Sequence, residues 1–402
     1  MTAAAVRDLS KERSIDTSSI RLTTDPLSVV RDPQVDIVVE LMGGEDAALD
    51  AVSEALDHNK HVVTANKALI ALHGNSLFGK AQEKGLVIAF ESAVAGGIPI
   101  IKSIREGLAA NRIEWLAGII NGTSNYILTE MENGGRSFPD VLSEAQALGY
   151  AEADPAFDVQ GTDAAHKLTI LASIAFGMPL QFHKVYVEGI EHIASEDIQY
   201  ASELGYRIKH LGIAKRNDEG IELRVHPTLI PKPRLIANVD GVMNAVLVQA
   251  DAVGPTLYYG AGAGSEPTAS AVIADLVDVV RSITADPENR VPHLAFQADT
   301  LSEPSANLEI LPIDQATTSY YLRISAVNQP GVLAQITQIF GDAGISIETI
   351  LQKGSNVAGD NVSIIILTQA TQERFLAQAI SDLESLQAVD GSIVRFRLES
   401  LS

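Results

Sequence analysis

The first part of the chain repeats a unit of strand, loop and helix, and this repeat constrains the fold more than any other feature. The run VDIVVEL at 35–41 precedes two glycines and a helical pattern of alanines. The stretch HVVTANKALI predicts a strand at 61–64 followed by a second helix, and GLVIAFESAVAGGIPII predicts a third strand that ends in a glycine-rich loop. Strands and helices that alternate at this spacing indicate a parallel α/β sheet over residues 1–90.

The usual opening of a dinucleotide-binding, Rossmann-type sheet is not visible. Such a sheet begins with a strand that leads into G-x-G-x-x-G at the N-terminus of a helix. No glycine precedes Gly43, and AAAVRDLSKERSI resembles the end of a second strand followed by basic residues. We therefore expect residues 1–90 to form an incomplete Rossmann-type domain that lacks its first βα unit, and we expect this chain to bind a dinucleotide poorly.

The remaining residues predict two further domains. Residues 91–299 mix helical patterns with β-rich stretches such as EWLAGII and IELRVHPTLI, which is typical of an α+β domain. Scattered prolines and polar residues predict a linker at 300–318. Residues 319–402 predict the order strand, helix, strand, strand, helix, strand, which is the βαββαβ pattern of a ferredoxin-like module.

Composition excludes several classes of protein. The formal charge of −22 repels a phosphate backbone, so we expect no nucleic acid partner. No apolar run has the length of about 18 residues that a membrane helix needs, and no apolar signal segment follows the charged start, so we expect a cytoplasmic protein without a membrane partner. The absence of cysteine excludes disulfides, thiolate metal sites and a cysteine nucleophile.

The most unusual segment is GYAEADPAFDVQGTDAAHK at 149–167, which is acidic yet runs into the apolar stretch LTILASIAF. Asp163 and Lys167 stand four residues apart, so they share one face of a predicted helix. Glu152 and Asp158 could fold back over that face, and carboxylates beside a partly buried lysine can bind an ammonium group and serve proton transfer. The spacing alone fits an ordinary surface ion pair equally well.

Three segments resemble the signature segments of homoserine dehydrogenase: NGTSNYILTEM at 121–131, the acidic segment at 149–167, and YGAGAGSEPTASAVIADL at 259–276. The resemblance implies NAD(P)-dependent interconversion of L-aspartate-4-semialdehyde and L-homoserine in threonine, methionine and isoleucine biosynthesis. It implies a homodimer or homotetramer in which 260–290 returns to the nucleotide-binding domain. Aspartate-semialdehyde dehydrogenase shares the substrate, but its acyl-enzyme chemistry needs a thiolate that this chain lacks. The alternative is a catalytically impaired, amino-acid-binding regulatory protein.

The resemblance assigns the substrate site residue by residue. Lys167 matches the family's catalytic lysine, and Glu152 and Asp163 match carboxylates that hold the substrate. Gly149 lies where the family contacts substrate and cofactor through the backbone, and Lys67 in TANK matches a residue that touches both nicotinamide and substrate. A lysine ammonium beside the aldehyde would supply the charge and the proton that a developing alkoxide needs. Without the resemblance, Lys67 would be interpreted as a solvated lysine at the start of a helix.

Further cofactor residues follow from the same comparison. Besides Lys67 and Gly149, Gly43 and Gly264 lie in glycine-containing loops where a backbone can approach a ligand closely, although many such glycines serve only turns. Basic residues from Arg7 onward follow the presumed second strand, where they suit the 2′-phosphate of NADP and an acidic residue would select NAD. The alternatives are plain surface charge at Arg7 and NAD as the cofactor.

The loop in FESAVAGGIPI is a candidate for a monovalent cation, sodium or potassium. By resemblance the ligands would be the Glu91 carboxylate and the backbone oxygens of Val94, Gly96 and Ile98, because hard cations prefer oxygen. A plain turn shaped by glycine and proline is the alternative.

The C-terminal segment NQPGVLAQITQIFGDAGISI resembles an ACT domain, a small-ligand regulatory module of amino-acid pathway enzymes. Asn328 and Gly331 lie in the turn where such domains often bind an amino acid at a subunit interface. The resemblance implies feedback by L-threonine. A dimerisation module without a ligand is the alternative.

Overall fold

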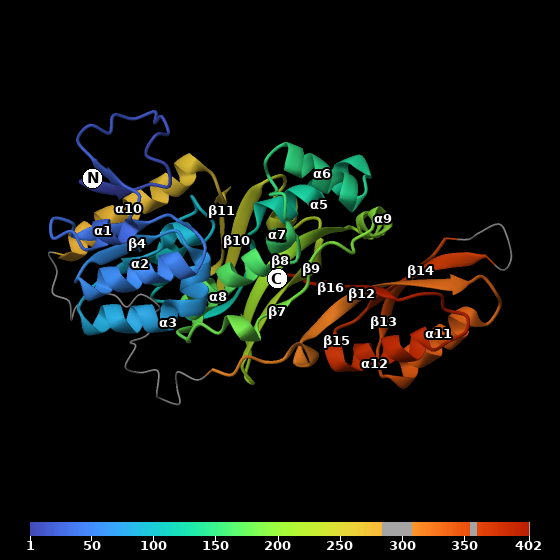
Figure 1. The fold of residues 1–402 in the computed structure, drawn as a ribbon. Coiled ribbons are helices and arrows are strands. Elements are labelled where there is room, and N and C mark those ends of the chain that lie inside the picture. Colours follow the sequence, from blue (N-terminus) through green and yellow to red (C-terminus); the bar gives the residue numbers. More distant parts are fainter. Residues whose placement is uncertain (284–307, 354–359, 402) are drawn as a thin grey trace. The chain divides into compact units, whose positions relative to one another are not determined.

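The computed structural model describes residues 1–283, 308–353 and 360–401 (Figure 1). The chain divides into two compact units. The first unit comprises Met1–Leu116, His166–His183 and Val248–Leu308, and the second comprises Ala117–Ala165, Lys184–Leu247 and Glu309–Ser402. None of the described helices combines the length and the apolar character needed to cross a lipid bilayer.

The first unit contains the predicted parallel α/β sheet. Strands β3, β4 and β5 are parallel and lie in that order, and each is joined to the next by a helix. A separate parallel pair, β1 and β2, precedes them. The named elements of this unit are β1 (Ala3–Ala5), β2 (Arg21–Thr23), α1 (Pro26–Val30), β3 (Ile37–Glu40), α2 (Asp46–Asp57), β4 (His61–Thr64), α3 (Lys67–Glu83), β5 (Ile88–Ala89), η1 (Glu91–Ala93), α4 (Ile100–Lys102), β11 (Gly254–Ala261) and α10 (Ser265–Ile283).

Hydrophobic periodicity explains why the helices cover this sheet. Helix α2 buries the side chains at positions 48, 51, 52, 55 and 56, the spacing of a single apolar stripe. Helix α10 arrives from the later part of the chain and packs Val272 and Val279 against Val63 and Val87. The sheet core of the first unit is therefore built from two distant segments of the sequence.

The second unit is organised around a long, mostly antiparallel sheet with the strand order β10-β6-β8-β9-β16-β12-β14-β13. Strands β8 and β9 pair over their whole length, from Tyr206 opposite Pro231 to Arg216 opposite Ile221. Strands β6 and β10 and helix α8 have residues in both units. Before the C-terminal module, the elements are β6 (Ile113–Ile119), α5 (Gly122–Gly134), α6 (Phe138–Ala147), α7 (Ala156–Val159), α8 (Thr162–Phe176), β7 (Tyr186–Val187), α9 (Ser195–Glu203), β8 (Tyr206–Arg216), β9 (Ile221–Pro231), η4 (Leu235–Asn238) and β10 (Met243–Ala250).

The C-terminal module has the predicted βαββαβ order, and both helices pack on one face of its sheet (Figure 1). Its first strand begins at Thr317, inside the segment 300–318 that the sequence predicts as a linker, and the part of that segment before residue 308 lies outside the described residues. The elements are β12 (Thr317–Val327), α11 (Val332–Asp342), β13 (Ile347–Gln352), β14 (Asn361–Thr368), β15 (Thr371–Gln372), α12 (Glu373–Glu384) and β16 (Val394–Leu398).

Strand β16 pairs in parallel with β9, which places Arg397 opposite Thr228 and Leu398 opposite Leu229. This pairing makes the sheet of the C-terminal module continuous with the rest of the sheet in the second unit.

Candidate active site

The amide of Asn121 brings two carboxylates of the acidic segment together in the second unit. Asn121 is the N-cap of α5, where its Oδ1 accepts a hydrogen bond from the Ser124 backbone at 2.8 Å. Its Nδ2 donates to Asp158 Oδ1 at 2.7 Å and to Asp163 Oδ2 at 2.8 Å. Because the amide is neutral, it fixes both carboxylates without removing their negative charge. The arrangement suits a ligand that carries an ammonium group.

The turn at Gly149 and several hydrogen bonds to backbone carbonyls hold the acidic segment next to α5 and α6. Gly149 has φ +77° and ends α6 in a Schellman motif, in which its own N–H donates to Gln146 O and the N–H of Tyr150 donates to Ala145 O. Thr123 Oγ1 donates to Tyr150 O at 2.7 Å. Gln146 Nε2 donates to the carbonyl of Glu152 at 3.0 Å, and the side chain of Glu152 is exposed. The conformation at Gly149 therefore shapes the turn that leads to Glu152.

Helix α8 carries both Asp163 and Lys167. The two residues are four positions apart in this helix, so they lie on one side of it with an axial rise of about 6 Å between them. Only 3% of Asp163 and 9% of Lys167 are exposed. An ionisable residue this well buried is uncommon, and the burial argues against an ordinary solvated surface pair.

A buried glutamate holds the loops that follow β3 and β4 in the first unit. Glu40, at the end of β3, accepts hydrogen bonds from the N–H groups of Met42 at 2.7 Å and Gly43 at 3.3 Å. Its other oxygen accepts from Thr64 Oγ1 at 2.6 Å. Gly43 has φ +69°, a conformation that favours glycine. The carboxyl ends of parallel strands are where α/β enzymes bind ligands.

Asn66 connects the same loops to the helix that begins with Lys67. Asn66 is the N-cap of α3, because its side chain accepts a hydrogen bond from Leu69 N at 3.1 Å. Its Nδ2 donates to Gly44 O at 2.7 Å. This hydrogen bond joins the loop that contains Gly43 to the start of the helix that contains Lys67.

The predicted cation loop is sharply turned. Ala95 and Gly96 have φ of +55° and +51°, and a left-handed conformation is uncommon for alanine. A Cβ at Gly96 would lie 2.5 Å from Gly262 O, so the loop packs directly on the glycine run before α10. Gly264 ends that run with φ +121°, immediately before α10.

Glu91 lies buried next to this loop. Its two oxygens accept hydrogen bonds from Ile101 N at 2.8 Å and Lys102 N at 2.9 Å, and its own N–H donates to Asp275 Oδ2. Burial raises the pKa of the Glu91 carboxyl, and the backbone hydrogen bonds oppose that shift. Within the described parts of the chain, no three His, Cys, Asp or Glu side chains gather as a metal site. A cation here would depend mainly on backbone carbonyl oxygens.

The other predicted site residues are Arg7, Asn328 and Gly331. Arg7 is exposed in the first unit, two residues after β1. Asn328 and Gly331 lie between β12 and α11, where Gly331 has φ +91° and its carbonyl accepts the first helical hydrogen bond from Gln335. The left-handed conformation at Gly331 explains why the turn contains glycine.

Sequence patterns missed Asn121, Glu40 and Asn66 as site residues. The available signal was an Asn directly before a helical pattern, as in NGTSNY and TANKALI, which is typical of an N-cap. For Glu40 the signal was a single carboxylate at the end of a β-branched run.

Comparison with known proteins shows which family the chain resembles. The family model for the NAD-binding domain of homoserine dehydrogenase matches residues 1–91, the model for homoserine dehydrogenase matches 99–277, and the ACT domain model matches 320–386. The homoserine dehydrogenase of Pseudomonas aeruginosa is 62% identical over 387 residues, which cover 96% of this chain and 88% of that protein.

The chain belongs to the homoserine dehydrogenase family.

Other relatives are consistent with this assignment. The homoserine dehydrogenase of Neisseria gonorrhoeae is 53% identical, with 99% of this chain and 91% of that protein covered. The crystal structure of a homoserine dehydrogenase from Thiobacillus denitrificans is 61% identical, covers 100% of this chain with 90% of that chain, and superposes with a TM-score of 0.94. The catalytic function predicted from the three signature segments is therefore confirmed, and a purely regulatory protein is not favoured.

Proposed function

We propose that this homoserine dehydrogenase uses NADPH to reduce L-aspartate-4-semialdehyde to L-homoserine, and that it binds the substrate at the carboxylates joined by Asn121. The observation that carries the proposal is the double hydrogen bond from Asn121 to Asp158 and Asp163. Both substrate and product carry an α-ammonium group, and two carboxylates held together by a neutral amide are complementary to it. The enzyme would act in threonine, methionine and isoleucine biosynthesis in the cytoplasm.

The acidic segment supplies the remaining substrate contacts in this proposal. Glu152 is exposed at the end of the turn that Gly149 creates, so its carboxylate can reach a ligand without a buried partner to displace. Gly149 contributes its backbone, which the absence of a Cβ leaves open to close approach. Asp163 is buried and held by Asn121, so it provides the fixed part of the site.

Lys167 is the proposed proton donor. Bound NADPH supplies the hydride for aldehyde reduction. The Lys167 ammonium stabilises the negative charge that develops on the substrate oxygen and delivers a proton to that oxygen. In the oxidation of homoserine the same amine receives the hydroxyl proton. Its position four residues after Asp163 in α8 supports this role.

The cofactor residues are proposed from the loops after β3 and β4 and before α10. Lys67 and Gly43 are held together through Asn66, and Gly264 opens α10, whose N-terminal amides favour a phosphate group. Arg7 suits the 2′-phosphate of NADP. A hyperthermophilic archaeal homoserine dehydrogenase in complex with NADPH, 28% identical, superposes on 64% of this chain with a TM-score of 0.56.

Two further ligands belong to the proposal. The carbonyls of Val94, Gly96 and Ile98, with Glu91, would hold sodium or potassium, and the left-handed turn at Ala95 and Gly96 supports this because it changes the direction of successive carbonyls. The cation would fix the glycine run against which this loop packs.

The second ligand is L-threonine, proposed as the effector of the C-terminal module. Asn328 and the turn at Gly331 would bind it, in a homodimer or homotetramer.

Substitution of Lys167 tests the catalytic assignment. Lys167→Ala should lower kcat by about 10²- to 10⁴-fold, because a proton donor contributes that much to a transition state. The Kd for NADPH, measured by fluorescence titration, should change little. Lys184→Ala, which removes an exposed lysine from the turn after α8, is the matched control and should retain full activity. Full activity in Lys167→Ala would overturn the proton-donor role.

A further inference from the structure

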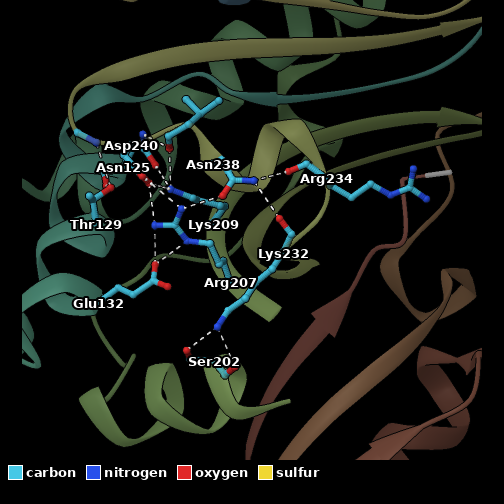
Figure 2. Close-up of polar contacts among 12 residues, drawn as sticks. Asn125, Thr129, Glu132, Ser202, Arg207, Lys209, Lys232, Arg234, Asn238 and Asp240 are labelled. Atoms are coloured by element: carbon cyan, nitrogen blue, oxygen red, sulfur yellow. Dashed lines mark hydrogen bonds and ion pairs between the residues drawn. The ribbon is translucent and has the colours of Figure 1, made fainter. Parts of the chain in front are cut away.

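Lys209 is buried in the interior of the second unit, where it contacts the N-terminal part of α5. Lys209 is on β8, and only 1% of its surface is exposed. Its ammonium donates to Val239 O at 2.6 Å, Asp240 Oδ1 at 3.0 Å and Asn125 Oδ1 at 3.2 Å (Figure 2). An ammonium has three N–H groups, so these three acceptors account for all of them. The group is therefore buried with complete hydrogen bonding.

The partners of Lys209 tie the turn at 239–243 to α5. Asn125, in the second turn of α5, donates from Nδ2 to Val239 O at 3.0 Å and to Met243 O at 3.1 Å. Gly241 N donates to Thr129 Oγ1 at 3.1 Å, one helical turn further along. Figure 2 shows Asn125, Thr129 and Lys209 converging on this turn. The turn is thus attached to α5 by side chains on two successive helical turns.

The same turn meets the first residue of α5. A Cβ added at Gly122 would lie 2.8 Å from Val242 O, so the helix start and the turn are in direct contact. Gly122 follows Asn121, the residue that joins Asp158 and Asp163. Asn125 N donates to Asn121 O at 3.3 Å, which connects the Lys209 partner to Asn121 by one backbone hydrogen bond. A shift of the turn would therefore move the Asn121 amide.

Stability alone is a weak reason for a charged group at this position. Burying an ammonium has a desolvation penalty of several kcal/mol, and apolar replacements of buried ionic groups are often equally stable. The hydrogen bonds of Lys209 are directional, and they join one atom of β8 to three acceptors on α5 and on the turn. They therefore fix the relative position of these three elements more strictly than apolar packing would.

We propose that Lys209 is a positioning residue of homoserine dehydrogenase: it fixes the turn at 239–243 against α5 and so holds Asn121 where it can join the two substrate carboxylates. The inference rests on the proposed substrate site at Asn121, Asp158 and Asp163.

The charged groups around Lys209 determine how its hydrogen bonds to the turn and to α5 respond to pH. Asp240, on the turn, and Arg207, on β8, form an ion pair with N···O 2.8 Å, and Glu132, on α5, binds the same arginine. Burial lowers the pKa of Lys209, and the hydrogen bond from Lys209 to Asp240 opposes that shift. Asp240→Asn keeps an acceptor oxygen but removes the negative charge. A neutral lysine would retain two N–H groups for three acceptors, so the turn would loosen.

Steady-state kinetics of Lys209→Met provide the first test. Methionine fills most of the volume of the lysine side chain but has no N–H group, so all three hydrogen bonds of Lys209 are lost. We expect the KM for L-homoserine to rise about tenfold or more, because a small displacement of a binding group is sufficient for such a loss. The KM for the cofactor should stay within about twofold of the wild-type value. The matched control is Lys232→Met, which removes a lysine bonded to Ser202 in the same unit (Figure 2) and should leave both constants unchanged.

The variant Asp240→Asn tests the positioning role even if Lys209→Met does not fold. Asp240→Asn should fold, and the pH above which its KM for homoserine increases should be lower than in the wild type. A folded Lys209→Met with a wild-type KM, an equal rise in Lys232→Met, or an unchanged pH profile in Asp240→Asn would each overturn the positioning role. Asp163→Asn separates the two hypotheses: if its KM for homoserine is unchanged, the proposed substrate site itself is wrong.

Discussion

A single amide, that of Asn121, holds two carboxylates that lie 37 and 42 residues away in the sequence. Asn66 acts similarly in the first unit: its oxygen caps α3, and its Nδ2 binds the carbonyl of Gly44. Serine caps a helix about as well as asparagine, but its hydroxyl has one hydrogen and cannot donate to two carboxylates as the Asn121 amide does. At both helix starts the asparagine that caps the helix also holds another segment.

His210 shows how a buried side chain near the acidic segment limits the enzyme at low pH. Its Nε2 donates to Glu188 O at 3.0 Å, which requires the neutral ring to carry its proton there, and a Cβ at Gly161 would lie 3.1 Å from the ring. Burial lowers the pKa of His210 to about 4 from 6.5. Between these values the unfolded state binds more protons than the folded state, so stability falls as pH decreases from about 6.5 to about 4.

We predict that His210→Gln reduces the acid sensitivity of the enzyme. Glutamine can donate to Glu188 O but does not titrate. The wild type should lose about 2 kcal/mol of unfolding free energy through His210 between pH 7.5 and pH 5, and the variant should lose that much less. Urea unfolding at the two pH values measures the difference. Equal losses in the two proteins would show that His210 already binds a proton in the folded state near pH 6.

At the scale of helices and strands, local patterns predicted the elements but not the contacts between them. The pattern in HVVTANKALI predicted a strand at 61–64, and β4 spans His61–Thr64. Periodicity is a property of neighbouring residues, so it is visible in the sequence. The hydrogen bonds from Thr64 to Glu40 and from Asn66 to Gly44 join residues 24 and 22 positions apart. No local pattern contains that information, because it depends on which strands become neighbours.

The link from Asn66 to Gly44 predicts a specific cofactor defect. Asn66→Ala removes the cap of α3 and the hydrogen bond to the loop, and it should weaken NADPH binding while lowering stability by about 1 kcal/mol. The matched control is Asn75→Ala on the same helix, which removes two hydrogen bonds to Leu180 at 3.0 Å each. Calorimetric titration should show weaker binding only for Asn66→Ala. Equal weakening in both variants would indicate a general effect of helix stability.

At the scale of the whole second unit, buried ion pairs join the C-terminal module to the segment that precedes β8. Asp197, on α9, is fully buried and accepts from Arg323 Nε at 2.6 Å and from Tyr321 at 3.2 Å. Arg397, on β16, binds Glu373 at 2.6 Å and Glu188 at 2.9 Å. Removal of the module would leave Asp197 without its arginine and would expose the apolar residues that pack against Tyr321 and Phe396. Point substitutions therefore test regulation more cleanly than deletion of the module.

Glu188 connects the module to the segment that contacts the acidic residues. Its carboxylate accepts from Arg397 of the module, and its carbonyl accepts from His210, whose ring packs on Gly161. Two residues further on, Ile190 N donates to Val159 O at 2.9 Å. Although burial opposes the shift, the hydrogen bond from His192 and the charge of Arg397 lower the pKa of Glu188, which stays ionised. The contacts of this one short segment therefore link β16 to the residues before Asp163.

If L-threonine acts through the C-terminal module, Glu188→Gln should weaken inhibition without impairing catalysis. Glutamine still accepts from Arg397 but loses the charge attraction, and Arg397 keeps its pair with Glu373, so the fold should persist. Substitutions along such a connection change coupling by about 0.5–2 kcal/mol, which corresponds to about a 2- to 30-fold higher threonine concentration for half inhibition. Arg395→Gln, on the same strand, removes a pair with Glu373 but does not involve Glu188, and it should respond to threonine as the wild type does. An unchanged threonine response in Glu188→Gln would mean that the effector signal reaches the substrate carboxylates by another route.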